Sequence, residues 1–187
     1  METNQEPRSV QFSQTTLTEL MIPSYSNFGG KIHGGILLSL IDKVAYACAS
    51  RHAGNYCVTV SVDNVNFLEP VEVGDLVSLH ASVNYVGKTS LIIGIKVTAE
   101  NVRNGIKRHT NTSYVTMVAK DDNNKPTPVP PLILETQEEG RRFVEAIKRK
   151  ELKEKFRIEF DDEKCQIELA NHLNELENQR CIIGWKN

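Results

Sequence analysis

The fold of this chain is decided by residues 34–51, GGILLSLIDKVAYACASR. Leu38, Ala45 and Ala49 widen the apolar arc of this stretch beyond the stripe of a surface helix, which predicts a helix buried on most sides. Arg51 suits the negative C-terminal end of such a helix, and Gly54 is a suitable stop. The residues that recur at three- and four-residue, helical intervals are Leu37, Leu40, Ile41, Val44 and Cys48.

The segments around this helix have the two-residue period of strands. Asn104-Gly105 is a strong hairpin signal, because both residue types tolerate positive φ. Val65 and Phe67 resume the alternation in the opposite phase, which predicts a bulge near Asp63-Asn64. One buried helix and an antiparallel sheet imply an α+β architecture. The predicted strands are 10–20, 58–67, 77–85, 91–99 and 114–119.

The composition changes after residue 135. Residues 136–187 hold 11 of the 22 Lys and Arg residues and 12 of the 24 Asp and Glu residues. Apolar residues stand among these charges at helical spacing, so we expect two amphipathic helices, with Asp161 or Asp162 near the start of the second.

Overall composition bounds the function. A formal net charge of -2 gives no basic excess for nucleic-acid binding, so we expect no nucleic-acid partner. The first residues lack the pattern of a secretory signal, and no apolar run approaches the ~20 residues of a membrane span. We therefore expect a cytoplasmic protein without a membrane partner. The four cysteines show no metal-ligand spacing, so we expect free thiols and no metal site.

The loop before the helix offers backbone donors. Its sequence, NFGGKIHGG over residues 27–35, places Gly34 and Gly35 at the helix start, where no side chain blocks the free N–H groups of the first turn. These donors suit a carbonyl oxygen that gains negative charge during a reaction. On spacing alone, a glycine loop that only lets the helix pack closely against the strands is the favoured explanation.

Asp42 is the unusual residue of the helix. It lies at the edge of the apolar arc, where a carboxylate is either a solvated surface group or a base placed in a cleft. The residue pattern alone leaves both interpretations open.

Four motifs together resemble the hotdog-fold acyl-CoA thioesterases, the acyl-CoA hydrolase family. They span roughly residues 12 to 132, in order and without large gaps. The motifs are MIP at 21–23 with NFGGKIHGGILL at 27–38 and Asp42, VTVSVDNVNF at 58–67 with the turn at 70–75, VGKTS at 86–90, and PVP at 128–130.

The resemblance implies a fold, an activity and a site. The fold is a hotdog, an antiparallel sheet wrapped around a long central helix, over residues 1–135, followed by a charged helical C-terminal extension over 136–187. The activity is hydrolysis of acyl-CoA to a free fatty acid and coenzyme A, without a cofactor. Asn27 and Asp42 match the catalytic pair, which opposite subunits of a dimer contribute. The Gly35 N–H is implied as a further partner of the thioester carbonyl, and Asp42 either activates water or attacks directly.

The same resemblance implies a homodimer with two complete sites, assembled as a trimer of dimers. Possible contacts of the acyl-CoA substrate are His33, Gly34, Thr59, Arg51, Lys88, Thr89 and Ser90, with Arg108 as a further cation. Two alternatives stay open: a hydroxyacyl-thioester dehydratase that uses His33 with Asp42, and a non-catalytic acyl-CoA sensor.

Overall fold

The computed structural model describes residues 6–177 and 179–185. The chain forms two compact units, one ending at Ala146 and one beginning at Ile147. The predicted domain boundary after residue 135 stays a prediction. In chain order the elements are β1 (Arg8–Ser9), α1 (Val10–Ser13), β2 (Thr15–Leu20), η1 (Pro23–Tyr25), α2 (Gly34–Ala53), β3 (Tyr56–Val62), β4 (Asp75–Val86), β5 (Ser90–Asn101), β6 (Ile106–Lys120), β7 (Leu132–Ile133), α3 (Gln137–Gln166), η2 (Leu169–Asn171) and α4 (Leu173–Leu176).

The first unit is built on one antiparallel sheet with the order β2-β4-β5-β6-β3. The turns after β4 and β5 join neighbouring strands directly, and Gly105 takes the predicted positive φ of 71° in the second turn. A second, two-stranded parallel pair joins β1 to β7. Because β3 is last in the order, one of its edges faces no strand formed by the described residues.

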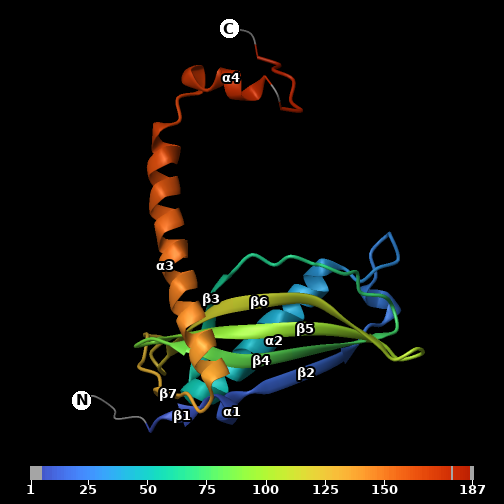
Figure 1. Cartoon of the computed structure of the whole chain (residues 1–187), viewed down its shortest axis with the longest axis vertical. Coiled ribbons are helices and arrows are strands. Elements are labelled where there is room, and N and C mark those ends of the chain that lie inside the picture. Colours follow the sequence, from blue (N-terminus) through green and yellow to red (C-terminus); the bar gives the residue numbers. More distant parts are fainter. Residues whose placement is uncertain (1–5, 178, 186–187) are drawn as a thin grey trace. The chain divides into compact units, whose positions relative to one another are not determined.

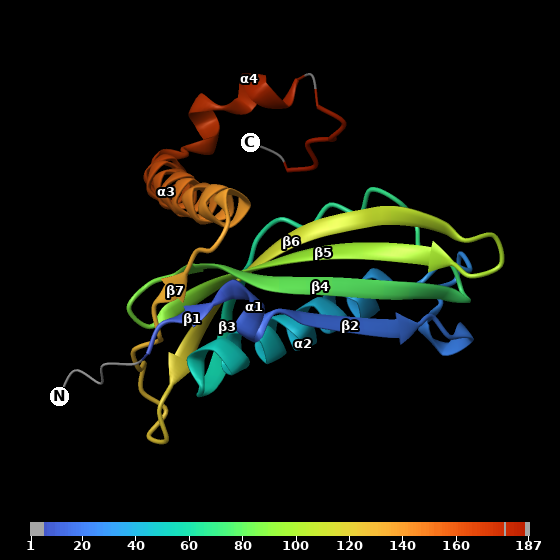
Figure 2. The same ribbon diagram turned by 60° about the horizontal axis from the view of Figure 1, so that its bottom comes forward.

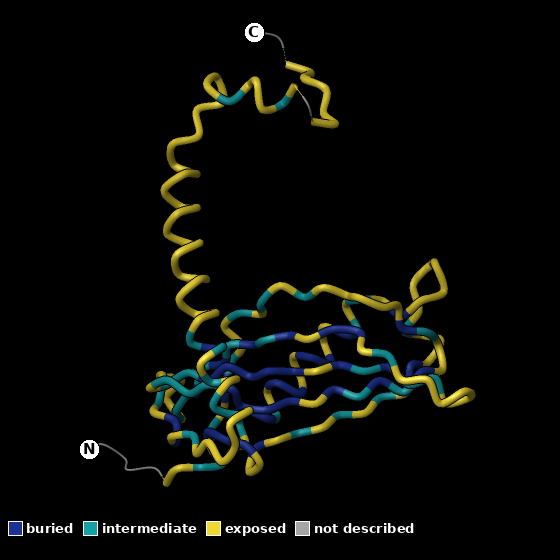
Figure 3. The backbone as a smooth tube through the Cα atoms, in the orientation of Figure 1, coloured by how far each residue is buried: buried dark blue, intermediate teal, exposed yellow. Residues whose placement is uncertain are grey.

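Helix α2 lies across one face of this sheet (Figures 1 and 2). The face of α2 toward the sheet is buried, with Ile41, Val44 and Ala45 at most 1% exposed, but Leu38 is 41% exposed, so within this chain the helix is not buried on most sides as predicted. The alternating residues of the central strands face the helix, as in Val77, Leu79, Ala81 and Val83 of β4, and the buried stretches of these strands stand out in Figure 3. Burying each large aliphatic side chain contributes roughly 1.5–3 kcal/mol, so this helix–sheet interface is the main source of stability.

Both ends of α2 are capped. At the N-terminus His33 accepts a hydrogen bond from the backbone of Gly35. At the C-terminus Gly54 has φ 71°, and its N–H donates to the carbonyl of Ser50 at 2.8 Å. The predicted helix stop at Gly54 is therefore confirmed. The structure extends the helix to Ala53, two residues past the predicted end.

Two details of the predicted strands are wrong. The first predicted strand begins with helix α1, because the Ser9 hydroxyl caps the N–H of Phe12 and Val10 turns into the core. The predicted strand 58–67 ends at Val62, and its irregularity lies between Thr59 and Ser61 and not at residues 63–64.

The second unit contains the C-terminal part of α3 and the short α4. Residues 147–166 belong to a single helix, so the prediction of a second helix starting at Asp161 or Asp162 is wrong. The physical reason is the absence of Gly and Pro between residues 141 and 166, so nothing breaks the helix there. All four cysteines are free, as predicted. Among the described residues no helix is long and apolar enough to cross a bilayer.

Candidate active site

The carboxylate of Asp42 is held by a residue from a different element. The Thr59 hydroxyl, on β3, donates a hydrogen bond to Asp42 Oδ1 at 2.6 Å. This contact forms where β3 departs from regular register, between Thr59 and Ser61. The sulfur of Met117 also lies 3.2 Å from the same hydroxyl.

The Thr59 hydroxyl has one proton, so it can donate either to Asp42 or to the sulfur of Met117. A hydroxyl donates once, and a carboxylate is a much stronger acceptor than a thioether sulfur. The Thr59 hydroxyl therefore donates its hydrogen bond to Asp42, and this bond fixes the rotation of the Asp42 carboxylate. Oδ1 accepts this bond, which leaves Oδ2 as the less engaged oxygen for a water molecule.

Asp42 borders a cavity between α2 and the free edge of β3. Its volume is about 420 Å³, and the rings of Tyr46 and Tyr56 meet at its side with centroids 5.9 Å apart. Asp42 is exposed in the single chain, and so are large apolar side chains on the same helix face and strand edge. These apolar neighbours are Leu38, Tyr46, Tyr56, Val60 and Val62. A carboxylate surrounded by an exposed apolar surface is the arrangement expected where a second molecule covers the site.

Asn27 lies in the exposed loop before α2. Its side-chain oxygen accepts hydrogen bonds from the N–H groups of Gly29, at 2.9 Å, and Lys31, at 3.2 Å. An ion pair between Lys31 and Glu72 ties the same loop to the sheet. Because the Asn27 oxygen is engaged within the loop, its NH₂ group is the part available to a ligand, and it can only donate.

The two residues of the predicted catalytic pair do not meet within one chain. Among the described residues, no hydrogen bond and no shared cavity joins Asn27 to Asp42. Asn27 precedes α2 and Asp42 lies two turns into it. Within one chain the two residues of the predicted pair therefore lie in separate places.

The predicted backbone donor is engaged in this structure. The N–H of Gly35 donates to His33 Nδ1 at 2.9 Å. A substrate carbonyl can take this N–H only if the His33 ring turns away. Gly34 shares the helix start and lies against Phe67, whose ring is 3.4 Å from where a Gly34 side chain would begin.

Arg51 lies away from Asp42. It stands nine residues farther along α2, about 14 Å at the rise of an α-helix. Its guanidinium donates to the carbonyls of Gln14, at 3.2 Å, and Phe12, at 3.4 Å, so it holds the N-terminal segment against the helix. Sequence reasoning missed this structural role.

Lys88 and Thr89 lie in the turn between β4 and β5, and Ser90 is the first residue of β5. The Thr89 carbonyl accepts from Ala119 at 2.9 Å, and the Lys88 carbonyl accepts from Val129 at 3.0 Å. Their backbone is thus built into the sheet end, while the Lys88 side chain is exposed. This turn and the Asp42 cavity share no residue, so within one chain they form separate places.

Arg108 forms an ion pair with Asp75. It donates to Asp75 Oδ2 at 2.6 Å, and Asp75 is 1% exposed. The same Asp75 oxygen accepts the N–H of Glu72 at 3.0 Å. The pair therefore pins the turn before β4 to β6.

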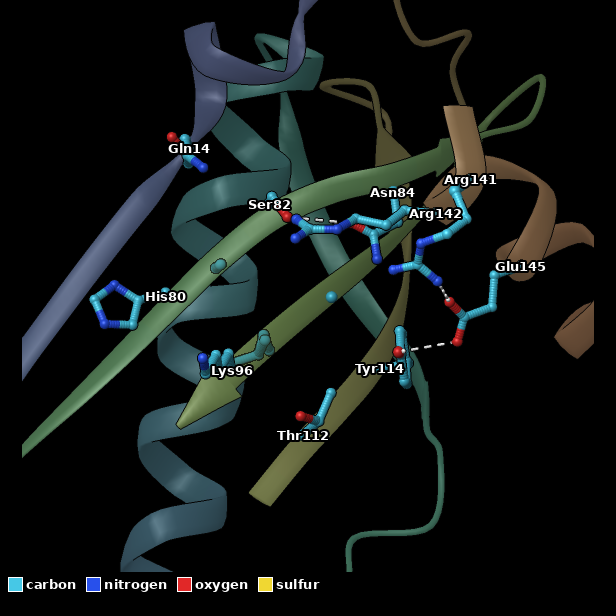
Figure 4. A pocket seen from close by; sticks show the side chains of 13 residues that line it. Gln14, His80, Ser82, Asn84, Lys96, Thr112, Tyr114, Arg141, Arg142 and Glu145 are labelled. Carbon is cyan, nitrogen blue, oxygen red and sulfur yellow. Dashed lines mark hydrogen bonds and ion pairs between the residues drawn. The ribbon is translucent and has the colours of Figure 1, made fainter. Parts of the chain in front are cut away.

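A second cavity of about 430 Å³ lies on the sheet face opposite α2, beside the first turns of α3 (Figure 4). Its floor contains Asn84, which accepts from Ser82 at 3.1 Å. Its cations Arg141 and Arg142 are paired with carboxylates of α3 itself. This cavity contains none of the predicted site residues. No cluster of metal-ligating side chains occurs in residues 6–177 and 179–185.

Comparison with known proteins agrees with this geometry. A family model described as the thioesterase superfamily matches residues 29–106. Protein VdlD of Helicobacter pylori is 47% identical over 137 residues, which are 73% of this chain and 78% of that protein. The uncharacterized acyl-CoA thioester hydrolase YkhA of Bacillus subtilis is 38% identical over 144 residues, which are 77% of this chain and 84% of that protein. The chain belongs to the hotdog-fold acyl-CoA thioesterases.

Solved structures of acyl-CoA thioesterases superpose on most of the chain. A hexameric acyl-CoA thioesterase without ligand matches with TM-score 0.78 and 37% identity, covering 80% of this chain and 96% of that one. The acyl-CoA hydrolase of Staphylococcus aureus, with a substituted asparagine and bound coenzyme A, matches with TM-score 0.78 and 31% identity, covering 84% and 95%. The same hydrolase was also solved with an aspartate and with a threonine replaced by alanine.

Proposed function

We propose that this acyl-CoA thioester hydrolase works through a site shared between two copies of the chain, with Asp42 from one copy and Asn27 from the other. The observation that carries the proposal is the Thr59–Asp42 contact at 2.6 Å on an otherwise apolar, exposed surface. A two-copy site requires that the Asp42 carboxylate be held in one rotation and that a second copy be able to cover its exposed apolar surroundings.

The free edge of β3 supplies the means of pairing. An edge strand presents unpaired N–H and C=O groups, and another strand satisfies them. Val60 and Val62 on this edge are 59% and 43% exposed. Pairing of two β3 edges about a two-fold axis would bury them and bring a partner surface over Asp42.

Asp42 acts on a water molecule through Oδ2 or attacks the thioester carbonyl directly. The Thr59 hydroxyl positions the carboxylate in either route. Covering the apolar surroundings removes bulk water from the carboxylate and strengthens its interactions with the reacting atoms.

Asn27 stabilises the oxygen that becomes negative. Its NH₂ group is free to donate because its own oxygen binds the loop N–H groups of Gly29 and Lys31. One such donor is typically worth about 3 kcal/mol of the barrier. Gly35 adds a second donor only after the His33 ring has moved, so Asn27 carries this role in the structure as it stands.

The S. aureus hydrolase supports the choice of residues. The asparagine, aspartate and threonine that were substituted in it follow one another at the same separations as Asn27, Asp42 and Thr59 here. The hexameric relative supports a trimer of dimers for this chain. A rat relative described as cytosolic, 36% identical over 144 residues, supports a cytoplasmic location.

The test is thiol release from acyl-CoAs of increasing chain length, with the native chain and with Asp42→Asn and Asn27→Ala. The proposal predicts hydrolysis by the native chain and a loss of roughly 100-fold or more in kcat for each variant. Lys125→Ala, an exposed residue of the turn after β6 and outside the Asp42 cavity, is the control and keeps its activity. A 3-hydroxyacyl-CoA should release thiol, and an enoyl product without thiol would contradict the proposal.

A further inference from the structure

The second unit presents an apolar stripe on α3 that no described part of that unit covers. Leu152, Phe156 and Phe160 follow one another at four-residue steps, so they share an arc of about 80° on the helix. They are 66%, 66% and 49% exposed, and the rings of the two phenylalanines stack at 5.7 Å. Figure 3 shows this whole stretch of α3 as exposed. We call these three residues the tail stripe.

Charge around the tail stripe is divided along the helix. Residues 148–157 contain six cations and two carboxylates, and residues 158–163 contain four carboxylates and no cation. Both carboxylates of the basic part are engaged locally, Glu151 with Lys148 at 2.9 Å and Glu154 with Arg157 at 2.6 Å. By count of side chains, residues 148–157 therefore carry a net charge of +4 and residues 158–163 a net charge of -4.

This division opposes the dipole of the helix. Carboxylates are unfavourable near a helix C-terminus, where the carbonyl groups already give a partial negative charge. Asp161, Asp162 and Glu163 lie in the last turns of α3, which ends at Gln166 and has Lys164 as the one cation of its last turn. A cationic neighbour at this end would remove the conflict, and the basic part of another α3 is such a neighbour.

The spacing of the stripe is symmetric about Phe156. Arg149 precedes Leu152 by three residues and Glu163 follows Phe160 by three, with steps of four residues between the apolar positions. If two such helices run antiparallel and cross at Phe156, Leu152 of one lies level with Phe160 of the other. Arg149 then lies level with Glu163, at both ends of the contact.

We propose that residues 148–163 of α3 form an antiparallel pair with the same residues of a second copy of this chain. The contact places the basic part of each helix beside the acidic part of the other and buries the tail stripe of both. A parallel pair would set like charges side by side along its whole length, which is unfavourable. The contact lies outside the catalytic site, so the inference does not depend on the proposed function.

The chain's own C-terminal segment is a poorer occupant. Ile167, Leu169 and Ile182 are themselves 58%, 50% and 97% exposed, and the tail stripe stays exposed in their presence. That segment also lacks the basic excess that the acidic part of α3 would attract, since Arg180 is its one cation among the described residues 167–177 and 179–185.

Thiol cross-linking of the full-length enzyme tests the geometry. In a Cys165→Ser, Cys181→Ser background, R149C and E163C are made singly and together and treated with a short bis-maleimide. The antiparallel pair predicts covalent dimers for the double variant and few for either single variant. The matched control R149C/D161C moves one thiol from position 163 to position 161, which lies about 200° around the helix from it. This control should cross-link at least tenfold more slowly.

Charge reversal tests the cause. F156C places a thiol at the crossing point and should cross-link to itself. Adding E163R should slow this reaction roughly tenfold, and adding R149E to E163R should restore it. Thiol release from acyl-CoA should stay unchanged in all variants, which shows that the first unit is intact.

Equal cross-linking of the single variants would contradict the antiparallel direction. Absence of dimers from the double variant would contradict the pairing altogether, whether the tail stripe is open or covered by the chain's own C-terminal segment. If adding R149E to E163R does not restore the cross-linking rate of F156C, pairing of the basic part with the acidic part is contradicted.

Discussion

Replacing Thr59 by alanine tests whether its hydroxyl positions the carboxylate of Asp42, the proposed catalytic residue. The hydroxyl donates to Asp42 Oδ1 at 2.6 Å, and a hydrogen bond to a charged group is worth about 1.5–3 kcal/mol. At 1.36 kcal/mol per factor of ten, Thr59→Ala should lower kcat by roughly 10- to 150-fold. Because the proposed role of the Thr59 hydroxyl is to hold the Asp42 carboxylate and not to bind the acyl chain, KM should change little.

Thr59→Ser is the matched control, because it keeps the hydroxyl and loses only a methyl group. The assay is steady-state thiol release with one acyl-CoA across a range of concentrations, together with thermal unfolding of each variant. The serine variant should retain most of the native kcat. If alanine stays within twofold of the native chain, or if serine is as impaired as alanine, the positioning role is refuted.

Three further changes test the scaffold. Asp75→Asn removes the charge that holds Arg108 and should cost about 3 kcal/mol of unfolding free energy in a denaturant titration, whereas a loss below about 1 kcal/mol would show that the pair is not structural. Gly94→Ala places a Cβ 2.3 Å from Asn84 Nδ2 and should cost about 1–3 kcal/mol, most of it recovered when Asn84→Ala is added. Burial lowers the pKa of His52 below its ordinary value of 6.5. The contribution of neutral His52 to the free energy of unfolding is therefore present above pH 6.5 and is lost as the pH falls through the lowered pKa. His52→Gln should flatten this pH dependence of stability, and an unchanged slope would refute the assignment.

Helix α2 and the hairpins were predictable because their signals are local. The apolar period of 34–51, the stop at Gly54 and the turn at Asn104-Gly105 each depend on a few neighbouring residues, and the structure has them where expected. The four-residue helix α1 was missed although Ser9 is a recognisable cap, because β-branched and Thr-rich composition favours a strand.

Contacts between distant residues were not predictable from spacing. Nothing in the sequence reports that Thr59 turns its hydroxyl to Asp42, since that depends on an irregular step in the register of β3. The engagement of Arg108 by Asp75 and of the Gly35 N–H by His33 likewise depend on packing. The long α3 was predicted as two helices because an acidic pair resembles a helix start, although no breaker precedes it.

Mixing two inactive variants tests the shared site most directly. Asn27→Ala and Asp42→Asn chains are purified separately, then unfolded together and refolded, or co-expressed with different tags. If each site takes Asn27 from one copy and Asp42 from the other, a mixed dimer holds one intact site. Random pairing should then restore about a quarter of the native thiol release. Activity that stays at the level of the separate variants, with mixed dimers demonstrated by tandem affinity purification, would contradict the shared site.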